Sequence, residues 1–105
     1  MVSFFLDTAQ PPEFVTCFPS SLAKHVDNHL ELSCTVNGSP HPVISWFYND
    51  NPLDRSSPRI KFLDGDRRLM IRRLRLVDTG IYSCLIKNEC GEKIRSCELN
   101  VASKF

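Results

Sequence analysis

Five cysteines and three histidines are the side chains of this 105-residue sequence that most readily do chemistry of their own. A thiolate can attack electrophiles, bind a metal or form a disulfide, and an imidazole can move protons or bind zinc. Zinc sites usually carry ligand pairs such as Cys-x-x-Cys, and no such pair occurs here. Gly-x-Ser-x-Gly, His-Glu-x-x-His and phosphate-binding glycine loops are also absent from the sequence. We therefore expect no catalytic residue, no metal and no cofactor. The eight residues are Cys17, Cys34, Cys84, Cys90, Cys97, His25, His29 and His41.

The odd number of cysteines bears on the compartment in which the chain works. In a secreted protein at least one of the five would stay unpaired or would join another molecule. Cys97 is in phase with Leu99 and Val101, which favours a small buried hydrophobic residue. Cys90 precedes Gly91 in a predicted hairpin turn, so we expect an exposed thiol there. Exposed thiols are tolerated in reducing compartments. We predict a cytoplasmic protein, with an extracellular protein as the alternative.

Length and composition predict one globular domain. The chain has 42% hydrophobic and 24% charged residues, and its 13 basic and 12 acidic residues give a net charge of +1. A charge so close to neutral argues against a general attraction to nucleic acid. The apolar run at residues 4–6 is far shorter than a membrane span. We assign residues 1–10 to a leader or linker, 11–102 to the domain and 103–105 to an exit segment.

Apolar residues recur at every second position and are interrupted by turn residues, which predicts many short strands and no long helix. Leu30 to Val36 alternate in this way, and the turn at residues 38–42 follows. A second run contains Ile44, Trp46 and Tyr48. The sequence Asp64-Gly65-Asp66 indicates a hairpin turn. The last two predicted strands, 81–87 and 93–101, are joined across a turn that contains Gly91, a residue able to take a positive φ angle.

Several of these residues are spaced as in immunoglobulin domains of the intermediate set, or I-set, which the chain resembles. Trp46 follows Cys34 by twelve positions, and residues 78–84 read Asp-x-Gly-x-Tyr-x-Cys. Leu69-x-Ile71, Asn88-x-x-Gly91 and Leu99-x-Val101 complete the pattern. The turn Val26-Asp27-Asn28 departs from the usual family sequence, and we expect Asn28 to supply a left-handed residue there. Tyr48 also replaces the lysine that is common in the family two positions after the tryptophan.

The resemblance implies an all-β, immunoglobulin-like Greek-key sandwich of two antiparallel sheets, with about 7–9 strands. Cys34 and Cys84 would meet between the sheets with Trp46 packed against them. The hydroxyl of Tyr82 would bond back to the backbone near Asp78, and Gly80 would permit the tight turn between them. The structural residues predicted on this basis are Cys34, Trp46, Leu69, Ile71, Asp78, Gly80, Tyr82, Cys84 and Cys97.

A cluster of basic residues is the first candidate for a functional surface. Eight of the thirteen basic residues fall between Arg55 and Arg75. A run of this kind often marks a solvated face, but it can also bind an acidic partner such as an actin filament or anionic lipid headgroups. The predicted basic patch consists of Arg67, Arg68, Arg72 and Arg73.

An apolar cluster is the second candidate. If Trp46, Cys84 and Cys97 point inward, then Phe47, Leu85 and Ile94 point outward from three neighbouring strands. Either flanking residues cover this cluster or it binds a protein partner.

The resemblance divides between two groups of proteins. One comprises intracellular muscle and cytoskeletal proteins of the titin, obscurin, twitchin, palladin and myosin light chain kinase type. The other comprises extracellular adhesion molecules and receptors. The number of cysteines favours the first group. By that resemblance the domain is a non-catalytic bead that resists tension, contacts neighbouring domains of its own chain and docks actin or sarcomeric proteins.

Overall fold

The computed structural model describes residues 8–104, which form ten β-strands and one short 3-10 helix. Residues 1–7 of the predicted leader and Phe105 lie outside the described residues. The strands are β1 (Gln10–Thr16), β2 (Ser21–His25), β3 (Leu30–Ser33), β4 (Thr35–Ser39), β5 (Val43–Tyr48), β6 (Asn51–Pro52), β7 (Ile60–Leu63), β8 (Arg68–Ile71), β9 (Gly80–Asn88) and β10 (Gly91–Ala102), with the 3-10 helix η1 (Leu76–Asp78) between β8 and β9. The all-β prediction is confirmed.

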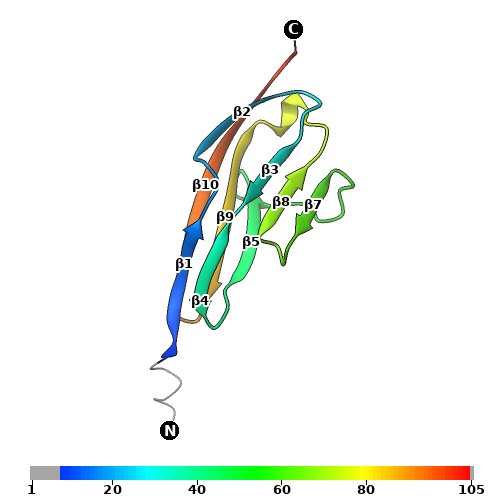
Figure 1. Ribbon diagram of the computed structural model, residues 1–105. Helices are drawn as coiled ribbons and strands as arrows, with labels where there is room; N and C mark the ends of the chain where they lie inside the picture. The colour runs from blue at the N-terminus through cyan, green and yellow to red at the C-terminus, as the bar shows by residue number, and fades with distance from the viewer. Residues whose placement is uncertain (1–7, 105) are drawn as a thin grey trace.

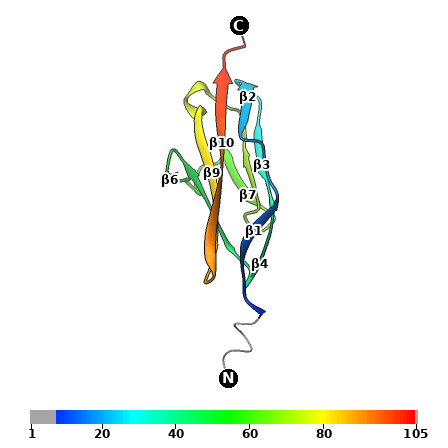
Figure 2. The ribbon, with the colours of Figure 1, turned by 90° about the vertical axis from the view of Figure 1, so that its left-hand side faces the viewer.

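The strands pack as two layers (Figures 1 and 2). One layer is a five-stranded sheet in the order β2-β10-β9-β5-β6. The other contains the sheet β3-β8-β7, and β4 continues the path of β3 to pair with β1. The number of strands exceeds the expected number because the chain breaks its pairing at Cys34, between β3 and β4, and because the two-residue strand β6 pairs with the end of β5.

One pair of strands departs from the expected antiparallel order. β2 runs parallel to β10, with Ser21 opposite Glu98 and His25 opposite Ala102. The chain reaches β2 because residues 17–20 belong to no strand and Pro19 has no N–H to give to a ladder. After Thr16, the last residue of β1, the chain therefore ends its pairing with β4 and crosses to the opposite layer.

The hydrophobic core lies between the two layers and follows the alternation seen in the sequence. Side chains of a strand point alternately to its two faces, so every second residue is buried in β3, in β8 and in β10 from Cys97 onward. The centre of β9 follows the same alternation, except that Ser83 is buried as well. The Trp46 indole is 4% exposed and donates from Nε1 to the Asp66 carbonyl oxygen at 2.7 Å. The buried core comprises Leu30, Leu32, Cys34, Ile44, Trp46, Leu69, Ile71, Leu74, Tyr82, Cys84, Ile86, Cys97, Leu99 and Val101.

Two turns show how local backbone shape is set. In the turn before β3 the left-handed residue is Asp27, with φ 70°, so the assignment of that role to Asn28 is wrong. Asp is one of the residues that tolerate this region, because its short polar side chain bonds locally. Gly80 has φ 155°, and a Cβ there would lie 2.6 Å from Cε1 of Tyr48. A larger residue at position 80 would therefore displace the Tyr48 ring.

Candidate functional sites: core thiols, a buried ion pair and two surfaces

Two cysteines and a tryptophan form the centre of the core. The sulfur atoms of Cys34 and Cys84 lie 4.0 Å apart, and Trp46 is paired with Cys84 across β5 and β9. The ring of Phe18 packs against Trp46 with 5.6 Å between centroids. The hydrogen bond with Cys84 lowers the pKa of the Cys34 thiol, and the charge of Arg67 acts in the same direction. The same contact, together with burial, raises the pKa of Cys84. Cys34 is therefore the member of the pair that more readily becomes a thiolate.

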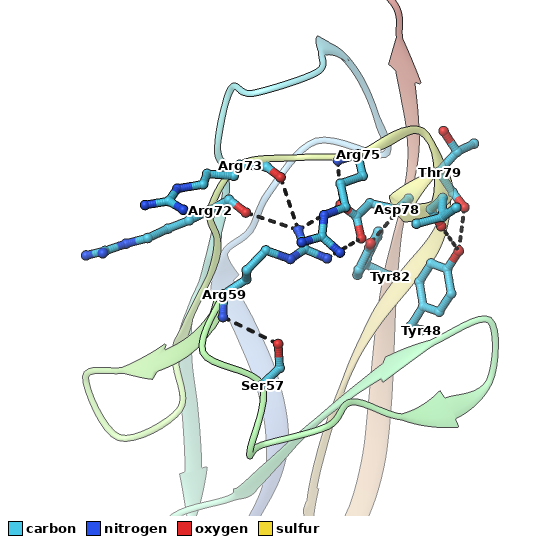
Figure 3. Close-up of polar contacts among 10 residues, drawn as sticks. Tyr48, Ser57, Arg59, Arg72, Arg73, Arg75, Asp78, Thr79 and Tyr82 are labelled. Atoms are coloured by element: carbon cyan, nitrogen blue, oxygen red, sulfur yellow. Dashed lines mark hydrogen bonds and ion pairs between the residues drawn. The ribbon is translucent and has the colours of Figure 1, made fainter.

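Two tyrosines fix the loop that contains η1 (Figure 3). The Tyr82 hydroxyl donates to the Asp78 carbonyl oxygen at 2.7 Å, as the sequence led us to expect. Burial of this phenol raises the pKa of Tyr82. The Tyr48 hydroxyl donates to the carbonyl oxygens of Val77 at 3.0 Å and Thr79 at 2.6 Å. Three carbonyl groups of one short loop are thus held by two rings that pack 4.9 Å apart.

An ion pair between Arg59 and Asp78 joins the start of β7 to this loop (Figure 3). Both terminal nitrogens of the guanidinium, Nη1 and Nη2, contact the carboxylate, at 3.0 and 3.1 Å, and Nη1 also donates to the carbonyl oxygens of Arg72 and Arg73. The oxygen that accepts from Nη1 of Arg59, Oδ2 of Asp78, also accepts a bond of 2.7 Å from the Arg75 backbone N–H. The two side chains are only 20% and 12% exposed. Bidentate hydrogen bonds between two charged groups are stronger than hydrogen bonds between neutral groups.

This ion pair was missed in the sequence, where Arg59 was counted only among the clustered basic residues. One signal was available. Asp78 was predicted to be a structural residue of the core motif, and a carboxylate placed near a core needs a cation or several N–H donors. Arg59 lies nineteen positions before Asp78, so spacing alone did not identify it as the partner.

The four residues of the predicted basic patch lie at the two ends of β8. Arg68 begins this strand and forms ion pairs with Glu31 at 3.0 Å and Asp64 at 3.5 Å. Arg67, just before it, is exposed and donates from Nε to the Asp64 carbonyl oxygen. Arg72 and Arg73 follow the other end of the strand and are exposed, and their side chains extend away from the ion pair (Figure 3). The charge of Arg68 is thus paired within the domain, whereas Arg67, Arg72 and Arg73 keep exposed side chains.

The predicted apolar cluster lies on the outer face of the five-stranded sheet. Ile94 is opposite Leu85 in the β9–β10 ladder, and Phe47 is opposite Ser83 in the β5–β9 ladder. Ile94 is 53% exposed, whereas Leu85 and Phe47 are half-buried. Alternation places two further exposed residues on this same face, Val43 at 70% and Ile81 at 46%. These five residues are called the outer apolar face below.

The remaining thiols lie in different surroundings. Cys97 is fully buried, and Cys90 is exposed in the turn between β9 and β10. Cys17 is also exposed, directly after β1. Across residues 8–104 no group of three or more His, Cys, Asp or Glu side chains is arranged to hold a metal. No helix in the described part of the chain is long and apolar enough to cross a membrane.

The two-layer sandwich, the Cys34–Trp46–Cys84 centre and the tyrosine bonded back to its own loop define an immunoglobulin-type domain. The sequence model of the immunoglobulin I-set domain matches residues 12–101. The chain belongs to the immunoglobulin I-set family, whose domains are typically non-catalytic modules.

Similar proteins carry such a domain as a small part of a long chain. Human hemicentin-1 is 30% identical over 99 residues, which are 93% of this chain and 2% of hemicentin-1. Vascular endothelial growth factor receptor 2 of Coturnix japonica is 44% identical over 69 residues, 66% of this chain and 5% of the receptor. Among solved structures, the complex of titin M10 with an obscurin-like 1 immunoglobulin domain contains a chain with TM-score 0.81 and 28% identity, covering 91% of this chain and 98% of that one.

Proposed function

We propose that the domain is a mechanical spacer and protein-docking bead of a longer intracellular muscle or cytoskeletal protein. The observation that carries this proposal is the placement of the chain ends. β1 begins at one end of the sandwich and β10 stops at the opposite end (Figure 1). A chain that enters and leaves at opposite ends can be joined in series with other domains, and tension then passes along the sandwich.

The strand pair β2–β10 is arranged to resist such tension. β2 follows the entry strand, β10 is the exit strand, and the two run parallel over five paired positions. The ladder is extended at both ends, by Glu98 N–H to the Ser20 carbonyl oxygen at 2.8 Å and by Val26 N–H to the Ala102 carbonyl oxygen at 2.9 Å. Pulling the ends of a parallel pair in opposite directions loads all of these bonds together rather than one after another.

Replacing Glu98 with proline tests the mechanical role. Proline lacks the N–H that reaches Ser20, and the loss of this ladder bond should cost about 1–3 kcal/mol. We expect a lower mean unfolding force for Glu98→Pro when the domain is stretched between its two ends in a single-molecule instrument. Glu98→Ala removes the same exposed side chain but keeps the N–H, and should unfold at the wild-type force. Equal forces for the two variants would contradict the proposal.

For docking, we propose that the outer apolar face receives another immunoglobulin domain. Val43, Ile81 and Ile94 are each at least 46% exposed on one sheet face, and apolar surface gathered in this way marks interaction sites. The similar chain found in the complex of titin M10 with an obscurin-like 1 immunoglobulin domain supports a partner of this class.

A charge at the centre of this face should abolish docking. Leu85 lies between its exposed neighbours, so Leu85→Asp buries an unpaired carboxylate in any contact that forms there. With the obscurin-like 1 immunoglobulin domain as the probe in calorimetry, we expect binding by the wild type and at least about a tenfold loss for Leu85→Asp. Val15→Asp is the matched control, because Val15 is 57% exposed on β1, away from this face. Equal affinities for the two variants would rule the face out.

The cytoplasmic location is proposed on the thiols. Cys17 and Cys90 are exposed, and three cysteines remain beyond the facing pair Cys34 and Cys84. Free surface thiols suit a reducing compartment. The alternative is an extracellular adhesion or receptor domain. It is favoured by the facing pair itself, which a disulfide would join in an oxidising compartment, and by the similarity to a growth factor receptor.

A further inference from the structure

Cys17, Cys34 and Cys84 form a line of thiols from the surface to the core. Thr16 and Thr35 are the last partners of the antiparallel β1–β4 pair, and their hydroxyl oxygens lie 2.7 Å apart. Cys17 follows Thr16 and Cys34 precedes Thr35, so the two cysteines flank the end of this ladder. Burial raises the pKa of Cys17, and Cys34 is close enough for its charge to add to that rise. Thr16 and Thr35 face each other, so their Cα atoms lie about 4.5–5.5 Å apart, and the cysteines one position further begin near the span of about 4.4–6.8 Å that a disulfide joins.

Exposure changes stepwise along this line. Cys17 is exposed, Cys34 is 4% exposed and Cys84 is fully buried. The sulfur atoms of the last two are 4.0 Å apart. A reagent larger than a few atoms therefore has access to Cys17 but not to Cys84. The charge of a thiolate at Cys17 is also felt in the core, where it raises the pKa of Cys84 and of Cys97.

The surroundings of Cys17 and Cys34 favour an anionic reagent. A hollow of about 290 Å³ is lined by Thr16, Cys34, Arg67 and Arg68; Cys17 does not line it but follows Thr16 in the chain. Asp64 also borders it, but the Asp64 carboxylate is paired with Arg68 at 3.5 Å. On the other side, the positive charge of Arg95 lowers the pKa of Cys17, opposing the larger effect of burial, which raises it. Glutathione disulfide is a small, negatively charged disulfide that meets this description.

We propose that Cys17 is the entry site for a low-molecular-weight anionic disulfide, and that it transfers oxidation from the surface to the buried Cys34–Cys84 pair. This inference concerns the chemistry of the domain itself and holds for either compartment considered above.

Three thiol–disulfide exchanges complete the transfer. The Cys17 thiolate attacks one sulfur of glutathione disulfide, forms a mixed disulfide and releases one glutathione thiolate. The Cys34 thiolate attacks Sγ of Cys17, which forms the Cys17–Cys34 disulfide and releases the second glutathione thiolate. The Cys84 thiolate then attacks Sγ of Cys34, forms the buried disulfide and returns Cys17 as a thiolate. In total, two protein thiols are oxidised and one glutathione disulfide is reduced to two thiols. Each exchange proceeds by attack of a thiolate on a disulfide sulfur.

The last exchange should be the slowest, because burial keeps the Cys84 thiol protonated. The Cys17–Cys34 disulfide should therefore build up before the buried disulfide appears. Direct attack on Cys34 by the reagent would give no such intermediate.

The experiment follows disulfide formation in the reduced chain after addition of glutathione disulfide, by acid quenching, alkylation and peptide mass mapping. We expect Cys17→Ser to slow formation of the Cys34–Cys84 disulfide by about tenfold or more, since an intramolecular step is replaced by an intermolecular one. Cys90→Ser is the control and should leave the rate unchanged, because Cys90 lies six residues beyond Cys84, in the turn between β9 and β10. A wild-type rate in Cys17→Ser would overturn the proposal.

A trapping variant gives an independent readout. Cys84→Ala cannot complete the last exchange, so it should accumulate the Cys17–Cys34 disulfide, and circular dichroism would establish that the variant folds. If it does not fold, early time points of the wild-type reaction replace it, and the Cys17–Cys34 peptide pair should appear and then decay. Formation of the buried disulfide without this pair, in either sample, would overturn the relay.

Discussion

Joining Cys34 and Cys84 by a disulfide is expected to raise the free energy of unfolding of this domain by about 4 kcal/mol. The two residues are 84 − 34 = 50 positions apart, so the bond would close a long loop and restrict the unfolded chain strongly. The sulfur atoms already face each other at 4.0 Å between the layers, so only a small movement of the side chains is needed. Urea unfolding of the reduced and oxidised forms, followed by the fluorescence of Trp46, measures the difference.

The control for this measurement is the double variant Cys34→Ala, Cys84→Ala treated with the same oxidant. Its stability should not change on oxidation, provided that Cys17 and Cys90 are replaced by serine in both proteins so that no other disulfide forms. An oxidised protein that is no more stable than the reduced one would mean that strain in the bridge offsets the restriction of the unfolded chain.

Whether Cys34 and Cys84 are joined by a disulfide in the tissue decides between the two proposed compartments. Alkylation of free thiols at the moment of tissue lysis should label all five cysteines if the domain is cytoplasmic. Peptides that carry Cys34 and Cys84 joined and unlabelled would instead support the extracellular alternative. In that case the domain would work with the extra stability of the disulfide.

Replacing Asp78 with alanine should destabilise the domain by about 3 kcal/mol and lower Tm by more than about 10 °C. The change leaves the Arg59 guanidinium, which is only 20% exposed, without its carboxylate partner. It also removes the acceptor of the Arg75 backbone N–H. Removing one member of a buried ion pair is costly because the remaining charge stays away from water. Thermal unfolding followed by circular dichroism measures the loss.

Glu13→Ala provides a matched comparison. Glu13 and Lys93 also approach to 3.0 Å, but their side chains are 54% and 44% exposed, so the loss should stay below about 1 kcal/mol. The double variant Arg59→Met, Asp78→Ala should cost clearly less than the sum of its two single changes, because no unpaired charge remains. Additive costs would show that the two residues stabilise the domain independently.

The strand pattern and the core of this protein were predictable from local sequence. A period of two in residues 30–36 and 44–48 reports which side of a strand is buried, whatever the strand pairs with. The bond between Tyr82 and the backbone of Asp78 spans four residues, and it too was expected from the motif. The outer apolar face was only partly anticipated, since Val43 and Ile81 were not included although they share the alternation of Phe47 and Leu85.

The sequence by itself thus predicted the strands and their buried faces, because alternation involves residues a few positions apart, and its resemblance to the I-set implied the sandwich and the tyrosine-anchored turn. The tertiary structure alone decided the partners of distant residues: the parallel pairing of β2 with β10, the ion pair that takes Arg59 out of the basic cluster, and the pairing of Thr16 with Thr35 beside two cysteines. These contacts depend on the register of strands far apart in the chain. Alternation does not fix that register, because the same pattern of buried and exposed residues is compatible with several pairings.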